Sequence, residues 1–137
     1  MKSGAIFHVF RLKPREDLKE SLMAYAKDNL IQAGAIVTCV GSLEQFNLRF
    51  ANRTQGVLKK GYFEILSLSG TVSASRTHLH ISLADHDGDT IGGHLLHDNL
   101  IYTTAEIVIA EISDLRFFPE TDSQYGYQEL GISPRES

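Results

Sequence analysis

Segments with the composition of β-strands fill most of this 137-residue chain. Turn-forming pairs separate several of them, among them Gly41-Ser42, Lys60-Gly61 and Asp87-Gly88. The Asp87-Gly88 pair lies between two apolar segments, which is a β-hairpin signal. We predict strands at residues 5–12, 35–40, 43–50, 62–70, 78–85, 89–96 and 105–118. The chain must therefore fold around a β-sheet.

One segment has the apolar spacing of an α-helix. Pro14 suits the first helical turn, and Glu16 and Asp17 lie where the positive end of the helix dipole favours acidic groups. Gly34 supplies the stop signal. The apolar stripe consists of Leu18, Leu22, Tyr25 and Ala26, with Leu30 and Ala33 farther along. Because nothing else in the sequence is clearly helical, we expect this stripe to pack on the sheet.

Two strand segments are apolar on both faces. They hold Ala35, Ile36, Val37 and Val40 in one case, and Ile107, Val108, Ile109, Ala110 and Ile112 in the other. A single helix covers only one face of a sheet, so the second apolar face needs another cover. Self-association provides it, and we therefore predict a homo-oligomer, with a closed ring favoured over an open array.

Composition indicates one soluble globular domain, with 42% hydrophobic and 22% charged residues and no internal repeat. No apolar run approaches the roughly 20 residues of a membrane helix, and the N-terminus lacks the features of a signal peptide. We expect no membrane association and a cytoplasmic location. The single cysteine, Cys39, lies in an apolar run, which favours a buried, inert thiol over a nucleophile.

The net charge of −4 disfavours sequence-independent binding to nucleic acid, so any such role must be local. The basic residues cluster weakly in two places, and we interpret both groups as solvated surface. The groups are Arg11, Lys13, Arg15 and Lys19, and then Arg49, Arg53, Lys59 and Lys60.

Four of the six histidines lie between residues 78 and 96, three of them placed as metal ligands would be. His78 and His80 are two apart, so in a strand they project from one face. If the Asp87-Gly88 turn folds the next strand back antiparallel, His94 comes near that pair. Three imidazoles with an open fourth position suit zinc, and neutral imidazole also suits nickel, copper or iron. His86 and His97 fall in or near loops.

The same histidines have a plainer interpretation, as polar residues at a subunit interface that need not converge. The neighbouring Asp85, Asp87, Asp89 and Glu106 are either partners that orient imidazoles or, for those beside glycine, solvated turn residues. Gly92-Gly93 lies within a strand, where glycine needs a reason such as a bulge or the close approach of another backbone. No phosphate loop or nucleophile elbow is present, and we assign no catalytic residue.

Three segments, GYFEILSLSGTVS (61–73), HLHISLADHDGDTIGGHLL (78–96) and TTAEIVI (103–109), resemble the PPC domain, the plants-and-prokaryotes-conserved domain. The similarity covers nearly the whole chain, with the motifs in the right order. It implies a single α+β domain over residues 1–137, with a core at about 4–118 and a C-terminal tail at 119–137. The tail is polar and broken by Gly126, Gly131 and Pro134, so we expect its last residues to fray. The implied architecture is a mostly antiparallel sheet packed with one main helix and assembled as a homotrimer.

The resemblance also implies partners. In plants such domains follow AT-hook segments, which this sequence lacks, and they contact transcription factors partly through a Gly-Arg-Phe-Glu-Ile-Leu segment. The matching positions are Gly61, Tyr62, Phe63, Glu64, Ile65 and Leu66, with Tyr62 in place of the arginine. Some stand-alone bacterial and archaeal members carry a histidine-bound metal, for which the matching positions are His78, His80 and His94.

Two hypotheses follow. The first is a non-enzymatic, homotrimeric regulatory module associated with DNA or with a protein partner. The second is a metal-binding protein, with Zn²⁺ or another divalent ion held by the three histidines, that senses or acts on a small molecule.

Overall fold

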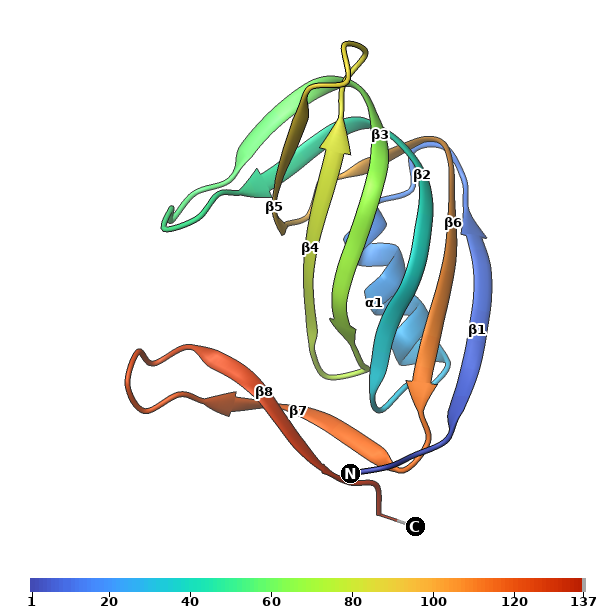
Figure 1. The fold of residues 1–137 in the computed structure, drawn as a ribbon, viewed down its shortest axis with the longest axis vertical. Coiled ribbons are helices and arrows are strands. Elements are labelled where there is room, and N and C mark those ends of the chain that lie inside the picture. The colour runs from blue at the N-terminus through green and yellow to red at the C-terminus, as the bar shows by residue number, and fades with distance from the viewer. Residues whose placement is uncertain (137) are drawn as a thin grey trace.

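The computed structural model describes residues 1–136, which form one helix and eight strands (Figure 1). In chain order the elements are β1 (Ala5–Leu12), α1 (Leu18–Asp28), β2 (Gly34–Arg49), β3 (Val57–Val72), β4 (Thr77–Ala84), β5 (Thr90–Leu95), β6 (Leu100–Ile112), β7 (Leu115–Thr121) and β8 (Gln128–Pro134). The α+β class and the single main helix are confirmed.

Six strands form one antiparallel sheet in the order β1-β6-β2-β3-β4-β5. The sheet curls so that β5 also pairs with the end of β2, through Leu48 opposite Leu95 and Arg49 opposite His94. Strands β2, β3, β4 and β5 thus close on one another at one end of the molecule (Figure 1). This closure places the end of β2 beside the β4–β5 hairpin.

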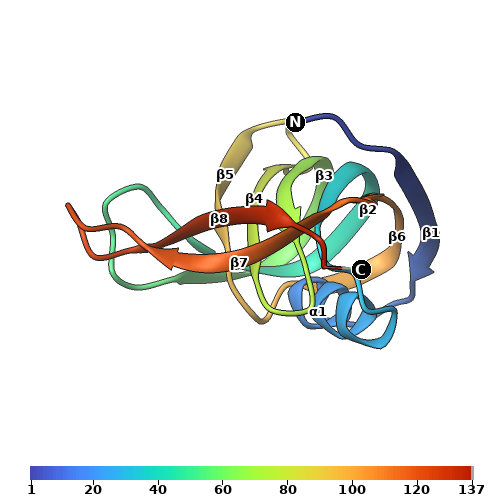
Figure 2. The ribbon, with the colours of Figure 1, turned by 90° about the horizontal axis from the view of Figure 1, so that it is seen from below.

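Helix α1 covers one side of the sheet and buries Leu18, Leu22 and Ala26 (Figures 1 and 2). Asp17 is its N-cap, because its carboxylate accepts a 2.9 Å hydrogen bond from the backbone N–H of Glu20. Pro14 therefore lies in the turn before the helix, not in its first turn as predicted. Within residues 1–136 no helix is long and apolar enough to cross a membrane.

The helix also ends earlier than its sequence pattern predicted. Asn29 is the C-cap, and Leu30 has a left-handed φ of 54° with 67% of its surface exposed. Ile31 takes the buried position instead. Gly34 begins β2, where a side chain would meet the carbonyl oxygen of Val72 at 2.6 Å.

Strand β2 spans two of the predicted strands without a turn at Gly41. A Cβ atom at Gly41 would lie 2.0 Å from the carbonyl oxygen of Thr104, so this glycine allows β6 to approach closely. Strand β3 likewise begins at Val57 and runs through Lys60-Gly61. The predicted strand at 105–118 is two strands, β6 and β7, which belong to different sheets.

Much of the C-terminal tail belongs to a second, two-stranded sheet. The expectation that its last residues fray concerns the end of the chain, where Ser137 lies outside the described residues. Strand β8 pairs with β7 along its whole length, and Gly131 lies against the ring of Phe118. Phe117 links this hairpin to the segments that precede β2 and β4. Its N–H donates to the carbonyl of Gln32 at 2.9 Å, and its carbonyl accepts from Ser75 Oγ at 3.2 Å.

Helix α1 lies on one side of β1, β6, β2 and β3 (Figure 1). The opposite side of these strands exposes large apolar side chains. We call this the outer face, and it carries Phe7, Val9, Val40, Tyr62, Leu66 and Tyr102. The rings of Tyr62 and Tyr102 pack together with centroids 4.6 Å apart. A helix on one side only thus leaves an apolar surface on the other.

Candidate metal centre

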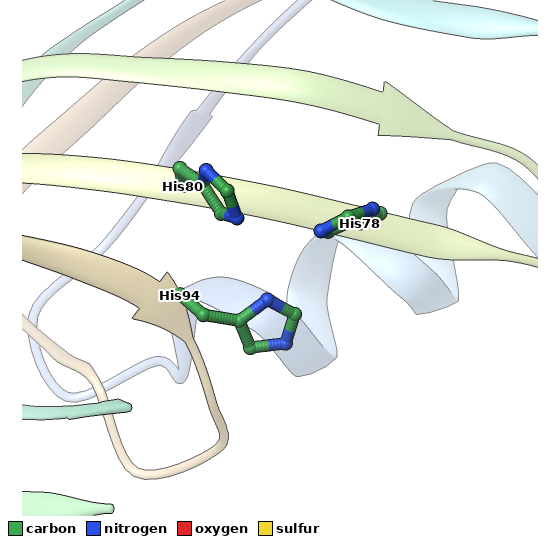
Figure 3. Close-up of side chains that lie close together, drawn as sticks. All are labelled: His78, His80 and His94. Atoms are coloured by element: carbon green, nitrogen blue, oxygen red, sulfur yellow. The ribbon is translucent and has the colours of Figure 1, made fainter. Parts of the chain in front are cut away.

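The three predicted ligands lie together on the β4–β5 hairpin (Figure 3). His78 and His80 project from the same face of β4, and His94 lies directly opposite His80 on β5. One ring nitrogen from each residue lies within 4.8 Å of the others. The ring centroids are 5.1–5.6 Å apart. The predicted convergence of these three side chains is confirmed.

The turn between the two strands explains this convergence. The carboxylate of Asp85 accepts hydrogen bonds from the backbone N–H groups of Asp87 and Asp89 at 2.9 and 3.0 Å, and Gly88 adopts a φ of 80°. These contacts return the chain antiparallel, as the Asp87-Gly88 pair predicted. Asp85 therefore serves the turn and does not orient an imidazole.

Gly92 and Gly93 are required by close backbone packing beside the cluster. A Cβ atom at Gly92 would lie 2.7 Å from the carbonyl oxygen of Ile81, and one at Gly93 would lie 2.9 Å from that of Arg49. The predicted close approach of another backbone is therefore found on both neighbouring strands.

The surroundings keep two of the imidazoles uncharged. Burial, followed by the positive charge of Arg49, lowers the pKa of His94 to about 4. Burial, followed by the charge of Arg76, also lowers the pKa of His78. A neutral imidazole offers the lone pair that a metal ion needs. Three imidazoles on one hairpin are a donor set that fits zinc and related divalent ions.

A cleft lined partly by arginine side chains lies beside the cluster. Its main part, of about 710 Å³, runs from the histidines along residues 49–54 to Tyr127. A second part of about 430 Å³ continues past Arg76 and Glu129, and Tyr127 borders both. The sequence predicts Arg49 to be solvated surface and places Tyr127 in the C-terminal tail. Only the β2–β5 register and the β7–β8 hairpin bring them to the histidines.

The segment from Gly61 to Leu66 alternates between the two sides of the sheet. Phe63 and Ile65 are buried in the core of the chain, each with 5% of its surface exposed. Tyr62, Glu64 and Leu66 are exposed, and two of these belong to the outer face. Of the side chains that the resemblance marked for partner contact, only the exposed three are available to a partner.

The remaining histidines lie apart from the cluster. His86 is in the β4–β5 turn and His97 is in the loop before β6, as expected. His8 belongs to a different network, in which its Nε2 lies 2.9 Å from Glu111 and its Nδ1 lies 3.2 Å from the hydroxyl of Tyr25.

Fold and cluster together define a small antiparallel α+β domain with a three-histidine site on its β4–β5 hairpin. Residues 2–113 match the Plants and Prokaryotes Conserved (PCC) domain. The chain belongs to this family, which confirms the resemblance drawn from the sequence.

Sequence relatives come from bacteria and plants. The bifunctional protein GlmU of Synechococcus sp. (strain JA-2-3B'a(2-13)) is 46% identical over 135 residues, which are 98% of this chain and 21% of that protein. AT-hook motif nuclear-localized protein 8 of Arabidopsis thaliana is 28% identical over 74% of this chain and 28% of its own length. The chain thus spans about a fifth of the length of the Synechococcus relatives it matches.

Solved structures share the whole fold. A hypothetical protein from Salmonella superposes with a TM-score of 0.97 at 35% identity, over 99% of both chains. A metal-containing protein from Archaeoglobus fulgidus gives a TM-score of 0.77 at 25% identity over 94% of each chain. A structure from Bacteroides thetaiotaomicron, named as a candidate DNA-binding protein, gives 0.79 at 21% identity over 94% of this chain and 96% of its own, and it supports the fold alone.

Proposed function

We propose that this chain is a metal-binding module in which His78, His80 and His94 hold a divalent transition ion, with zinc the first candidate. The observation that carries the proposal is the meeting of three imidazole nitrogens within 4.8 Å on adjacent antiparallel strands. The metal-containing relative from Archaeoglobus adds support from outside this chain.

The residues around the cluster suit a site that stays open to a small ligand. A bound ion would offer a fourth, exchangeable coordination position next to the cleft. His80 is exposed, whereas His78 and His94 are partly buried between β4, β5 and the arginines. The chain's own contribution is to hold the imidazoles in place and to keep His78 and His94 neutral.

Elemental analysis of protein purified without chelator and then incubated with excess zinc tests the proposal. We expect about one equivalent of zinc per chain, because three-imidazole sites hold zinc well. The double variant His78→Ala with His80→Ala should lose it, whereas His86→Ala with His97→Ala, which removes two loop histidines, should keep it. Less than about a tenth of an equivalent in the unaltered chain would falsify the proposal.

We further propose that the module self-associates through the outer face, as a homotrimer. Support comes from the six large apolar side chains exposed together on one side of the sheet. An exposed apolar surface of this kind is typical of a protein contact. Tyr62 and Leu66, from the segment marked for partner contact, lie within it.

Association with DNA is a second candidate. The AT-hook relatives favour it, together with Arg49, Arg53 and Arg76 around the cleft. The net charge of −4 opposes it. A filter-binding titration of A·T-rich duplex at low salt, with and without zinc, decides the matter. Retention that falls as salt rises supports DNA association, and the absence of retention under both conditions rejects it.

A further inference from the structure

We propose that the cleft beside the three histidines binds a small phosphate monoester, with Arg49 and Arg76 as its two cationic contacts. The inference deepens the proposed function and rests on it in one respect, since a bound metal ion would offer the phosphate a third contact. The placement of the two arginines depends on this chain's own fold and not on a metal ion.

Arg49 is placed beside the cluster by strand register. It pairs with His94 across β2 and β5, and His94 in turn pairs with His80 across β5 and β4. Directly opposed residues in an antiparallel sheet project from the same face with their Cβ atoms about 5 Å apart. Arg49, His94 and His80 therefore form one row across the sheet, and strand pairing keeps their Cβ atoms close together.

Arg76 approaches the cluster from the other side and is held by neutral acceptors. Its Nη1 donates to Thr71 Oγ1 at 3.3 Å, and its Nη2 donates to the carbonyl of Gln128 at 3.4 Å. The Nη2 atom also lies 3.3 Å from Nδ1 of His78, which places the guanidinium group beside the cluster. These contacts fix the side chain between β3, β4 and β8. They leave its positive charge uncompensated.

The charge balance of the cleft points to an anion. Among residues 1–136 the ion pairs are His8–Glu111, His86–Asp87 and Arg135–Glu111, so the arginines that line the cleft pair with no described carboxylate. Glu129 is the one described carboxylate on these walls. In a chain of net charge −4, this local excess of positive charge forms a site for a negatively charged ligand.

Size and chemistry narrow the ligand to a phosphate ester. The main cleft, of about 710 Å³, falls in the range of small-molecule sites. Guanidinium groups match the oxygens of phosphate, and a phosphate dianion has enough oxygens to meet two arginines and a metal ion at once. Phe50 and Tyr127 line the same cleft and provide an apolar wall for the organic part of the ester.

Isothermal titration calorimetry of the zinc-loaded chain, freed of excess metal, tests the inference with phenyl phosphate as the probe. We expect saturable binding that weakens at least about tenfold in Arg49→Gln and in Arg76→Gln, the factor for losing one charge-assisted hydrogen bond. Arg116→Gln is the matched control, because Arg116 is exposed on β7 and lies outside the cleft. Circular dichroism melting of each variant checks that it is folded.

The outcomes separate this inference from the metal proposal. Metal content is measured on the same samples, and the titration is repeated after chelation. If phenyl phosphate binds through the arginines to a chain that holds no metal, the phosphate inference is supported and the metal proposal fails. A zinc-loaded chain that gives no binding heat with millimolar phenyl phosphate, or equal affinity in the three arginine variants, overturns the inference alone. Tighter, arginine-dependent binding of a single-stranded oligonucleotide also overturns it, because the phosphate source is then a nucleic acid.

Discussion

His80 and His94 lie directly opposite each other across the β4–β5 ladder, and this pairing makes a cluster from residues fourteen positions apart. The pairing depends on the turn at one end of the hairpin and on the contact of β4 with β3 along its other edge. A change that moves β4 should therefore disturb the fold and the site together.

Gly70 tests this dependence. It lies on β3 opposite Leu79 with a φ of 135°, and a Cβ atom there would lie 2.0 Å from the carbonyl oxygen of His78. We expect Gly70→Ala to lower the free energy of unfolding by at least about 2 kcal/mol and to weaken zinc binding. Gly88→Ala is the control, because Gly88 also has a positive φ but a Cβ atom there would have nothing within 4 Å. Its cost should stay near 1 kcal/mol, with zinc binding retained. Chemical denaturation and zinc titration measure both effects, and equal losses in the two variants would contradict the steric argument.

The lowered pKa of His94 predicts how the metal-free chain responds to acid. Its pKa of about 4 lies below the ordinary histidine value of 6.5, so the unfolded chain takes up a proton at a higher pH than the folded one. Stability should be fully present above pH 6.5 and fall as the pH drops toward 4. In the presence of a chelator, His94→Gln should lose less stability across this window than the unaltered chain. The control variant His86→Gln, which changes an exposed turn residue, should lose as much stability as the unaltered chain. Urea unfolding at several pH values measures the difference, and parallel curves for all three proteins would refute the prediction.

The local parts of the site could be predicted from sequence because their geometry is short-range. The two-residue spacing of His78 and His80 fixes their common face, and the Asp87-Gly88 turn fixes the return of β5. Three predicted ligands therefore converge where the pattern placed them. The same short-range reasoning located the helix but missed its ends, because Asp17 acts as a cap and Leu30 leaves the apolar stripe.

The long-range parts could not be predicted in the same way. Arg49 reaches the site only because β2 continues without a turn through Gly41 and then pairs with β5. Tyr127 and Glu129 reach it because the tail folds into a hairpin with β7, although its glycines and polar residues resemble a frayed end. Glycine and other turn-forming residues occur both where the chain reverses and where another backbone passes close by. The sequence pattern alone therefore does not distinguish a turn from a continuous strand.

Burial raises the pKa of the Cys39 thiol to about 12, which predicts an unreactive cysteine. A thiol reagent such as 5,5′-dithiobis(2-nitrobenzoate) at pH 8 should label the folded chain far more slowly than the urea-unfolded chain. Because the folded state favours the neutral thiol, stability should be complete below the ordinary thiol pKa of 9.0 and fall as the pH rises toward 12. This loss should be smaller in Cys39→Ala, since that variant has no thiol to ionise. Rapid labelling of the folded chain would show that Cys39 is accessible.

Assembly through the outer face predicts different results for two neighbouring residues. Leu66 is 55% exposed on this face, so Leu66→Asp should leave the subunit folded and convert the proposed trimer to a monomer in light scattering. Ile65 is 5% exposed in the core, so Ile65→Asp places an unpaired charge inside the subunit and should unfold it rather than dissociate it. Leu30→Asp controls for the charge, because Leu30 is 67% exposed at the end of α1 with a backbone conformation that aspartate tolerates. A Leu66→Asp chain of unchanged mass and melting temperature would place the interface elsewhere, and a monomeric unaltered chain would remove the trimer proposal.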